Sequence, residues 1–317
     1  MKYCLLVILL LAPLSPRAAH LNDLQFLPDQ GTIVSTLGYG VRDDHYAVKV
    51  HAPGDQLNNF YRVEQDTSYL SIGGGYSFPH QIFLRVQTSY YYEDQSITTY
   101  ESGATIAGAE FKRNHKGLTD PTITFKYRVS DSLTSADFIF DVSGSISPST
   151  GKRKYASTTE DGNEKRGGTN YSIVMDIGKL DVGLRAYTLF VNAKRFGRTG
   201  GIDLLDNSSV TTSAHKSLGG GAKFKTLSSE YFYFELALEY GYLTDYTLEN
   251  LGNNTTVDQK NYLDILVGVD YEIKKDVIIW RSILNSYQSK YHTKTSTLNM
   301  DNDAGSLSYM TSLIYQY

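Results

Sequence analysis

Apolar and polar side chains alternate along this chain in about a dozen separate runs. Residues 82–92 show the pattern, because Ile82, Leu84 and Val86 share one parity while Arg85 and Gln87 share the other. Successive side chains of a β-strand point to opposite sides of the sheet. Each run therefore predicts a strand with one apolar face and one polar face.

Short and long links alternate between these runs. We predict twelve strands, at 31–42, 66–78, 81–94, 119–129, 136–147, 169–178, 180–192, 215–226, 230–244, 260–273, 276–288 and 305–317. The short links are 79–80, 130–135, Lys179, 227–229 and 274–275, and the long ones include 43–65, 95–118, 148–168, 193–214, 245–259 and 289–304. This alternation is typical of outer-membrane barrels, in which turns face the periplasm and loops face outward. The predicted fold is all-β, a closed antiparallel up-and-down transmembrane barrel.

The chain begins with the features of a secretory signal. Lys2 precedes an apolar core from Tyr3 to Leu14, which predicts a signal peptide over 1–19. We expect a periplasmic segment over 20–30 and the barrel over 31–317, in a bacterial outer membrane. Cys4 is the single cysteine and lies within the signal, so no disulfide is predicted. No later run reaches the roughly 18 apolar residues of a transmembrane helix.

Aromatic residues gather near the ends of the runs. The sequence has 26 tyrosines and one tryptophan, an excess that suits the aromatic girdles of a membrane barrel. One girdle is predicted at Tyr90, Tyr92, Tyr171, Phe190, Tyr240 and Tyr242, and the periplasmic one at Phe78, Tyr127, Phe138, Phe224, Phe232, Tyr271, Tyr315 and Tyr317. The last strand ends in Tyr317, which is similar to the signal read by the barrel-insertion machinery. We expect outer-membrane lipid, lipopolysaccharide and that machinery as partners.

Two other classes of protein are disfavoured. A soluble lipocalin-like barrel has the same alternation turned inside out, but about twelve strands enclose more space than apolar side chains can fill. A nucleic-acid partner is not suggested by a formal charge of −4. The polar face is therefore predicted to line a lumen.

The predicted lumen has a mixture of charges. Its candidate lumen and constriction residues are Arg85, Lys126, Arg128, Asp141, Asp181, Arg185, Lys223, Glu235, Glu239, Asp270 and Arg281. The same parity adds Asp137, Asp176, Lys225, Asp264 and Glu272, many of them near the periplasmic end. Two interpretations stay open. The charges either form ion pairs that only satisfy one another, or they form a constriction that selects small solutes.

Tyrosines and glycines add to the predicted inner face. Lumenal tyrosines are expected at Tyr69, Tyr91, Tyr187, Tyr233, Tyr262 and Tyr287, either as a surface for aromatic solutes or as space-filling side chains. Glycines cluster at 73–75 and 219–221 within strands, where they allow the strand to bend or a side chain to approach closely.

Catalytic residues are not evident. Some twelve-stranded outer-membrane barrels are lipid hydrolases, and the single nucleophile candidate is His215-Lys216-Ser217. No third group that would orient the histidine is apparent. The other histidines lack metal-ligand spacing. We therefore expect no enzyme activity, no metal and no cofactor.

Two stretches resemble a known family. Gly117-Leu118-Thr119-Asp120-Pro121 with Lys126-Tyr127-Arg128, and Pro148-Ser149-Thr150-Gly151-Lys152, are similar to features of the putative MetA-pathway phenol-degradation proteins, which are loosely FadL-like. Thr119 replaces a glycine of that pattern, and Ser149 separates the proline from Thr-Gly. The resemblance implies a barrel transporter and leaves the solute open.

The sequence thus predicts an outer-membrane channel for passive uptake of small aromatic or amphipathic solutes. A second hypothesis is a structural or adhesive surface barrel that acts through its extracellular loops. Outer-membrane lipid hydrolysis is a third hypothesis, and it has the least support.

Overall fold

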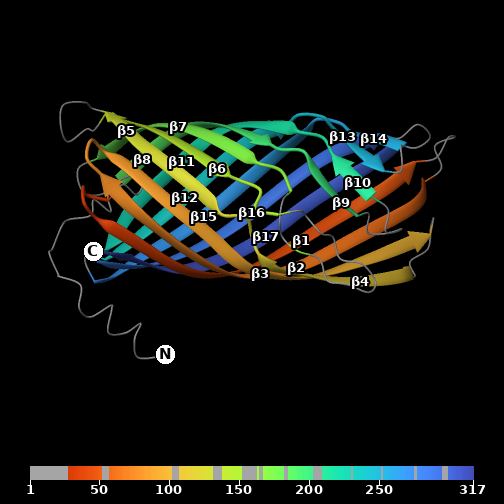
Figure 1. Ribbon diagram of the computed structural model, residues 1–317, viewed down its shortest axis with the longest axis horizontal. Coiled ribbons are helices and arrows are strands. Elements are labelled where there is room, and N and C mark those ends of the chain that lie inside the picture. Colours follow the sequence, from red (N-terminus) through yellow and green to blue (C-terminus); the bar gives the residue numbers. More distant parts are fainter. Residues whose placement is uncertain are drawn as a thin grey trace.

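The computed structural model describes residues 28–51, 57–101, 107–130, 138–151, 163, 167–181, 185–202, 209–229, 231–250, 253–274, 277–294 and 299–317. They form 17 strand segments of one antiparallel sheet that closes on itself (Figure 1). Closure is made by the pairing of β1 with β17, which runs from Val34 opposite Gln316 to His51 opposite Asn299. The segments are β1 (Ile33–His51), β2 (Leu57–Phe78), β3 (Ile82–Glu101), β4 (Ala107–Leu118), β5 (Thr122–Ser130), β6 (Ile139–Ser147), β7 (Asn170–Asp181), β8 (Arg185–Phe196), β9 (Thr199–Ile202), β10 (Ser209–Thr212), β11 (His215–Ser229), β12 (Phe232–Leu243), β13 (Tyr246–Asn250), β14 (Asn253–Val257), β15 (Lys260–Lys274), β16 (Ile278–Lys294) and β17 (Asn299–Gln316).

Five consecutive pairs of segments each continue a single strand of the wall. These are β4–β5, β8–β9, β10–β11, β12–β13 and β14–β15, each interrupted by two or three residues. The 17 segments therefore make a closed barrel of twelve strands, and the predicted fold class is confirmed. Among the described residues there is no helix that is long and apolar enough to cross a bilayer.

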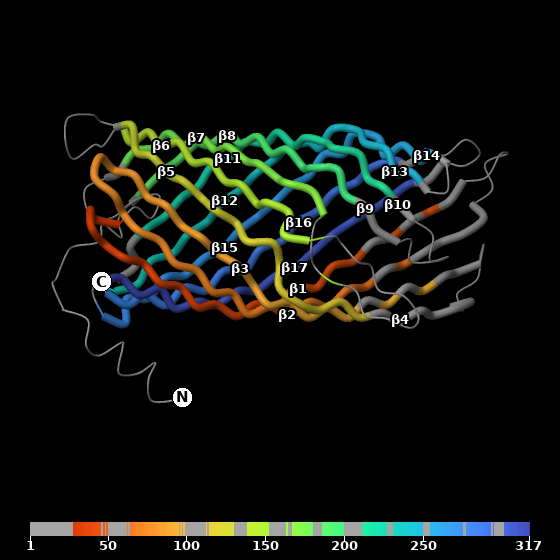
Figure 2. The backbone as a smooth tube through the Cα atoms, viewed as in Figure 1, coloured from red at the N-terminus to blue at the C-terminus, as the bar shows by residue number. Residues whose placement is uncertain are grey.

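The two ends of the barrel differ. At one end, here called the turn end, short links join β2 to β3 and β15 to β16, and Ile33 and Tyr317 exchange backbone hydrogen bonds of 2.7 and 3.0 Å. The segments β9, β10, β13 and β14 lie at the opposite end of the barrel, here called the loop end (Figure 2). Pro79-His80-Gln81 forms one short turn, in which His80 and Gln81 have positive φ angles of 63° and 62°.

Several of the stretches predicted as long loops consist mostly of strand. β1 continues to His51 and β2 begins at Leu57, where a loop over 43–65 is expected from the sequence. β3 and β4 likewise extend through most of 95–118, and β16 and β17 through most of 289–304. Polar residues are frequent in these extensions, so the alternation from which strands are predicted is weaker there. Backbone pairing nevertheless continues through them.

The outer face of the wall is apolar. Large hydrophobic side chains lie exposed along it, with Leu189 64%, Ile72 61% and Val191 58% exposed. Such a continuous exposed apolar surface is expected where lipid replaces water. On β3 this belt runs from Leu84 to Tyr92. It ends at a row of three aspartates that pair in register across β1, β2 and β3, namely Asp43, Asp66 and Asp94.

Candidate functional site: the barrel lumen

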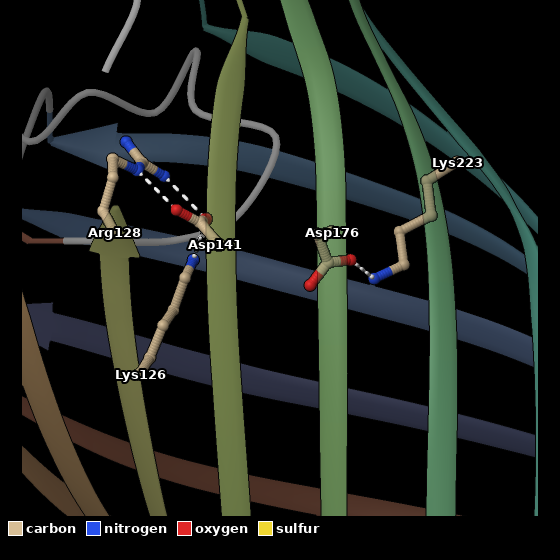
Figure 3. A network of polar contacts seen from close by, with 5 residues as sticks. All are labelled: Lys126, Arg128, Asp141, Asp176 and Lys223. Atoms are coloured by element: carbon tan, nitrogen blue, oxygen red, sulfur yellow. Dashed lines mark hydrogen bonds and ion pairs between the residues drawn. The ribbon is translucent and has the colours of Figure 1, made fainter. Parts of the chain in front are cut away.

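Charged side chains occupy part of the inner face near the turn end. Asp141 on β6 is 1% exposed and accepts hydrogen bonds from Arg128 Nε at 2.8 Å and Arg128 Nη2 at 3.0 Å. Lys126 Nζ lies 3.1 Å from the same carboxylate (Figure 3). Register places Arg128 directly opposite Asp141, and parity turns Lys126 the same way. The carboxylate therefore holds two cations from one neighbouring strand.

A second ion pair continues this arc. Asp176 on β7 lies 3.4 Å from Lys223 Nζ on β11, across the intervening β8 (Figure 3). Lys223 also lies 4.7 Å from the centroid of the Phe190 ring, so its charge has an aromatic neighbour as well.

The third group of ion pairs is centred on Asp270 of β15. Asp270 is 3% exposed and lies 2.7 Å from Lys225 Nζ, while Arg281 donates to its two oxygens at 2.6 and 2.7 Å. Two-pronged arginine contacts of this kind are strong and directional. Arg85 lies on the same inner face and donates to Thr36 Oγ1 at 3.2 Å. We call these three groups, centred on Asp141, Asp176 and Asp270, the turn-end ion pairs.

Apolar side chains also line the turn end. Five inward side chains pack as one buried cluster, here called the turn-end cluster: Val34, Phe83, Tyr233, Ile279 and Ile314, each 7% exposed or less. A Cβ on Gly75 would lie 2.5 Å from the tip of the Phe83 ring, so this glycine of the 73–75 cluster makes room for it. The lumen is therefore narrowed at this end by both apolar and charged side chains.

The middle of the lumen contains neutral and acidic groups. Tyr262 donates to Glu239 Oε1 at 2.6 Å, and Asn192 Nδ2 donates to the same oxygen at 2.8 Å. Tyr262 and Tyr287 stack with ring centroids 5.7 Å apart. The ring of Tyr69 lies against Gly40 of β1, and Tyr91 donates to Glu93 further toward the loop end, where Gln65 donates to it too.

Parity on the inner face matches the sequence prediction at most sites. Arg85, Lys126, Arg128, Asp141, Lys223, Glu235, Glu239, Asp270 and Arg281 share the inward parity of their strands, as do Tyr69, Tyr91, Tyr233, Tyr262 and Tyr287. Asp181 and Arg185 pair at a hairpin end, but their side chains lie outside the described residues, as does Asp137.

The predicted lumenal position of Tyr187 is wrong. Tyr187 is 46% exposed on the outer face, where it lines an apolar hollow of about 650 Å³ with Leu189 and Phe224. Phe190, predicted for an outer girdle, is 7% exposed and points inward. Both errors come from placing a turn at Lys179, because β7 continues to Asp181. A shift in the turn by an odd number of residues exchanges the two faces of the next strand.

Some inward residues escape the sequence prediction. Asn192 faces the lumen, and so do Val34, Phe83, Ile279 and Ile314 of the turn-end cluster. A signal for the cluster exists, since Phe83 shares parity with Arg85 and Ile279 shares parity with Arg281. The prediction overlooked these residues because, apart from tyrosines, it assigned the apolar side chains to the outer face.

The candidate nucleophile does not form a catalytic pair. His215 Nδ1 contacts the Ser213 carbonyl oxygen at 3.1 Å, and its ring stacks between Phe196 and Tyr246 at 4.7 and 4.6 Å. Ser217 Oγ instead lies 3.3 Å from the Tyr262 hydroxyl. The two side chains thus have separate partners.

The two stretches that resemble the phenol-degradation family contact each other. Asp120, which is 6% exposed, accepts hydrogen bonds from the backbone nitrogen of Thr150 at 2.8 Å and from its hydroxyl at 2.7 Å. Asp120 lies at the break between β4 and β5, and Thr150 follows β6. This contact fastens the two segments at the inner rim of the wall.

Comparison with known proteins identifies the fold of this chain. No protein-family model matches the chain, and no curated protein matches it. The chain is similar to the solved COG4313 outer membrane channel from Pseudomonas putida F1, with a TM-score of 0.52, 11% identity and coverage of 90% of this chain and 96% of that one. It is also similar to the TodX deltaS2S3 mutant monoaromatic hydrocarbon channel (TM-score 0.42, 8% identity, 95% and 93% covered) and to the outer membrane protease OmpT from Escherichia coli (0.38, 10%, 93% and 99%).

These identities establish a likeness in fold. The chain has the fold of an outer-membrane β-barrel, which implies a bacterial outer membrane as its location. The resemblance to the phenol-degradation family is supported as far as the outer-membrane β-barrel fold.

Proposed function

We propose that this chain is an outer-membrane channel for the passive passage of small aromatic or amphipathic solutes. One arrangement supports the proposal above all: the stacked pair Tyr262–Tyr287 lies in the lumen on the loop side of the turn-end constriction. A solute that enters from the loop end meets these tyrosine rings before the apolar and charged side chains of the turn end. The resemblance of 117–128 and 148–152 to transporter sequences agrees with this order.

The experiment is conductance of the purified barrel in planar bilayers, followed by swelling of liposomes in phenol and in a sugar of similar size. We expect discrete channel currents and faster entry of phenol than of the sugar. A second barrel carrying Tyr262→Ala and Tyr287→Ala is expected to lose the preference for phenol, whereas Tyr90→Ala, on the outer face with 51% exposure, is expected to keep it. A barrel that passes neither ions nor phenol would overturn the proposal.

One observation favours the second hypothesis, a surface-binding barrel. The hairpins β1–β2 and β3–β4 continue well beyond the apolar belt, as do β16 and β17. Shortening β3–β4 at its loop end separates the two functions, because adhesion should then fall while phenol entry is retained.

A further inference from the structure

We propose that the middle of the lumen holds a binding site for a protonated amine, centred on Glu239 and Asp264. The inference rests on the proposed function, since the amine reaches this site through the lumen. The two carboxylates lie directly opposite each other on β12 and β15, and both face inward. Like charges in this position repel and destabilise a sheet unless something compensates them.

These two carboxylates lack the cations that accompany the turn-end acids. Asp141, Asp176 and Asp270 each lie within 3.4 Å of a lysine or arginine nitrogen. Among the described side chains, no lysine or arginine forms an ion pair with Glu239 or Asp264, and Lys194 faces Asp264 from longer range. Their partners are neutral donors: Tyr262 and Asn192 for Glu239, and Asn285 for Asp264. Partly buried carboxylates without a counterion are costly, so the site calls for a cation.

The surrounding oxygen atoms also lack donors. Asn192 is 6% exposed, and its Oδ1 is buried with no hydrogen-bond partner. Asp264 Oδ1 and Asn285 Oδ1 are buried and unpartnered in the same way. An ammonium group has three N–H donors and a positive charge, so it supplies what this set of acceptors lacks. No group of three or more acidic, histidine or cysteine side chains suited to a metal gathers among the described residues, which favours an ammonium over a metal ion.

Two glycines make the site possible. A Cβ on Gly219 would lie 2.6 Å from the Tyr262 hydroxyl, 2.8 Å from Glu239 Oε1 and 3.2 Å from Asn192 Oδ1. Those three polar atoms therefore converge on the space that the missing side chain leaves. A Cβ on Gly241 would press on the Tyr262 ring from the next strand. This accounts for one glycine of the 219–221 cluster.

An aromatic surface adjoins the carboxylates. Asp264 lies opposite Tyr287 in the pairing of β15 with β16, and Tyr287 stacks on Tyr262. Tyrosine faces attract cations and also accept apolar chains. The ligand that fits both parts is an amine with a short aliphatic or aromatic tail.

The test is block of the channel current by n-hexylammonium, with n-hexanol as the uncharged probe. We expect n-hexylammonium to block the native barrel and n-hexanol to leave the current unchanged. The variant with Glu239→Gln and Asp264→Asn should need about tenfold or more n-hexylammonium for half block, since hydrogen bonds to ionised groups are roughly twice as strong as those to neutral ones. The control variant, Asp43→Asn with Asp66→Asn, removes two charges from the outer face and should behave as the native barrel does.

Further measurements separate this site from channel function. Calorimetric titration of n-hexylammonium into the detergent-solubilised barrel tests binding even in a barrel that carries no current. Ammonium chloride, used in its place, separates recognition of the charge alone from recognition that also uses the tyrosines. Unchanged half block in the Glu239 and Asp264 variant, or equal block by n-hexanol, would overturn the proposal. Heat-dependent gel migration shows that each variant is folded.

Discussion

Asp270 is a residue whose loss should cost the barrel much of its stability, because two inward cations depend on it. Lys225 and Arg281 lie within 2.7 Å of its oxygens, and all three side chains are largely removed from solvent. Asp270→Asn leaves those charges without a counterion, which we expect to lower the free energy of unfolding by about 3 kcal/mol. Urea titration of the folded band on unheated gels measures the change. The control is Asp303→Asn, whose exposed contact with Lys290 at 3.8 Å should contribute less than about 1 kcal/mol.

Residue by residue, the inner face was predictable only where strand parity was known. Arg128 and Asp141 were placed on the face that they occupy because polar and apolar residues alternate around them, at 122–129 and 140–142. Tyr187 was not, because parity after a turn depends on the number of residues in it. The sequence also does not predict that Glu239 has no lysine or arginine partner, because this depends on which side chains of non-adjacent strands reach its carboxylate.

Single-cysteine variants test the corrected face of β8. Cys4 is the only cysteine of the sequence, and removing it gives a background for labelling. A dye at Tyr187→Cys should be quenched strongly by brominated lipid, because Tyr187 faces outward. The same dye at Tyr69→Cys, on the inner face, should be quenched weakly. Equal quenching at both positions would contradict the assignment of the two faces.

At the scale of the element, the break between β4 and β5 is the feature that sequence and structure explain together. Pro121 lacks the N–H that would continue a strand, and Asp120 beside it accepts two hydrogen bonds from Thr150. Asp120→Ala removes the oxygen that accepts both hydrogen bonds, so we expect a local loss of about 1–3 kcal/mol and faster proteolysis near 148–151. Asp120→Asn retains an acceptor oxygen and should be cleaved at close to the native rate. Mass spectrometry of the fragments locates the cuts.

Elements outside the membrane were the hardest to foresee. β1, β2 and β3 have 19, 22 and 20 residues, although their apolar alternation covers only part of that length. Within the bilayer every backbone group needs a partner and one face must be apolar. Outside the bilayer, backbone pairing alone can hold a hairpin together. Such pairing does not need a continuous apolar face, so hydropathy does not reveal it.

For the whole molecule, passage depends on what fills the lumen at the turn end. Phe83 and Ile279 are 5% and 1% exposed, and they lie across the pathway in the turn-end cluster. Phe83→Ala with Ile279→Ala removes the bulk of that cluster, so single-channel conductance should rise while stability falls by about 2–5 kcal/mol per site. Leu84→Ala changes the next residue of β3, which is 37% exposed on the outer face, and it should leave conductance unchanged. Because Asp270 and its cations are unchanged in the double variant, an increase would assign the barrier to the turn-end cluster. Conductance equal to that of Leu84→Ala would mean that the barrier lies elsewhere along the lumen.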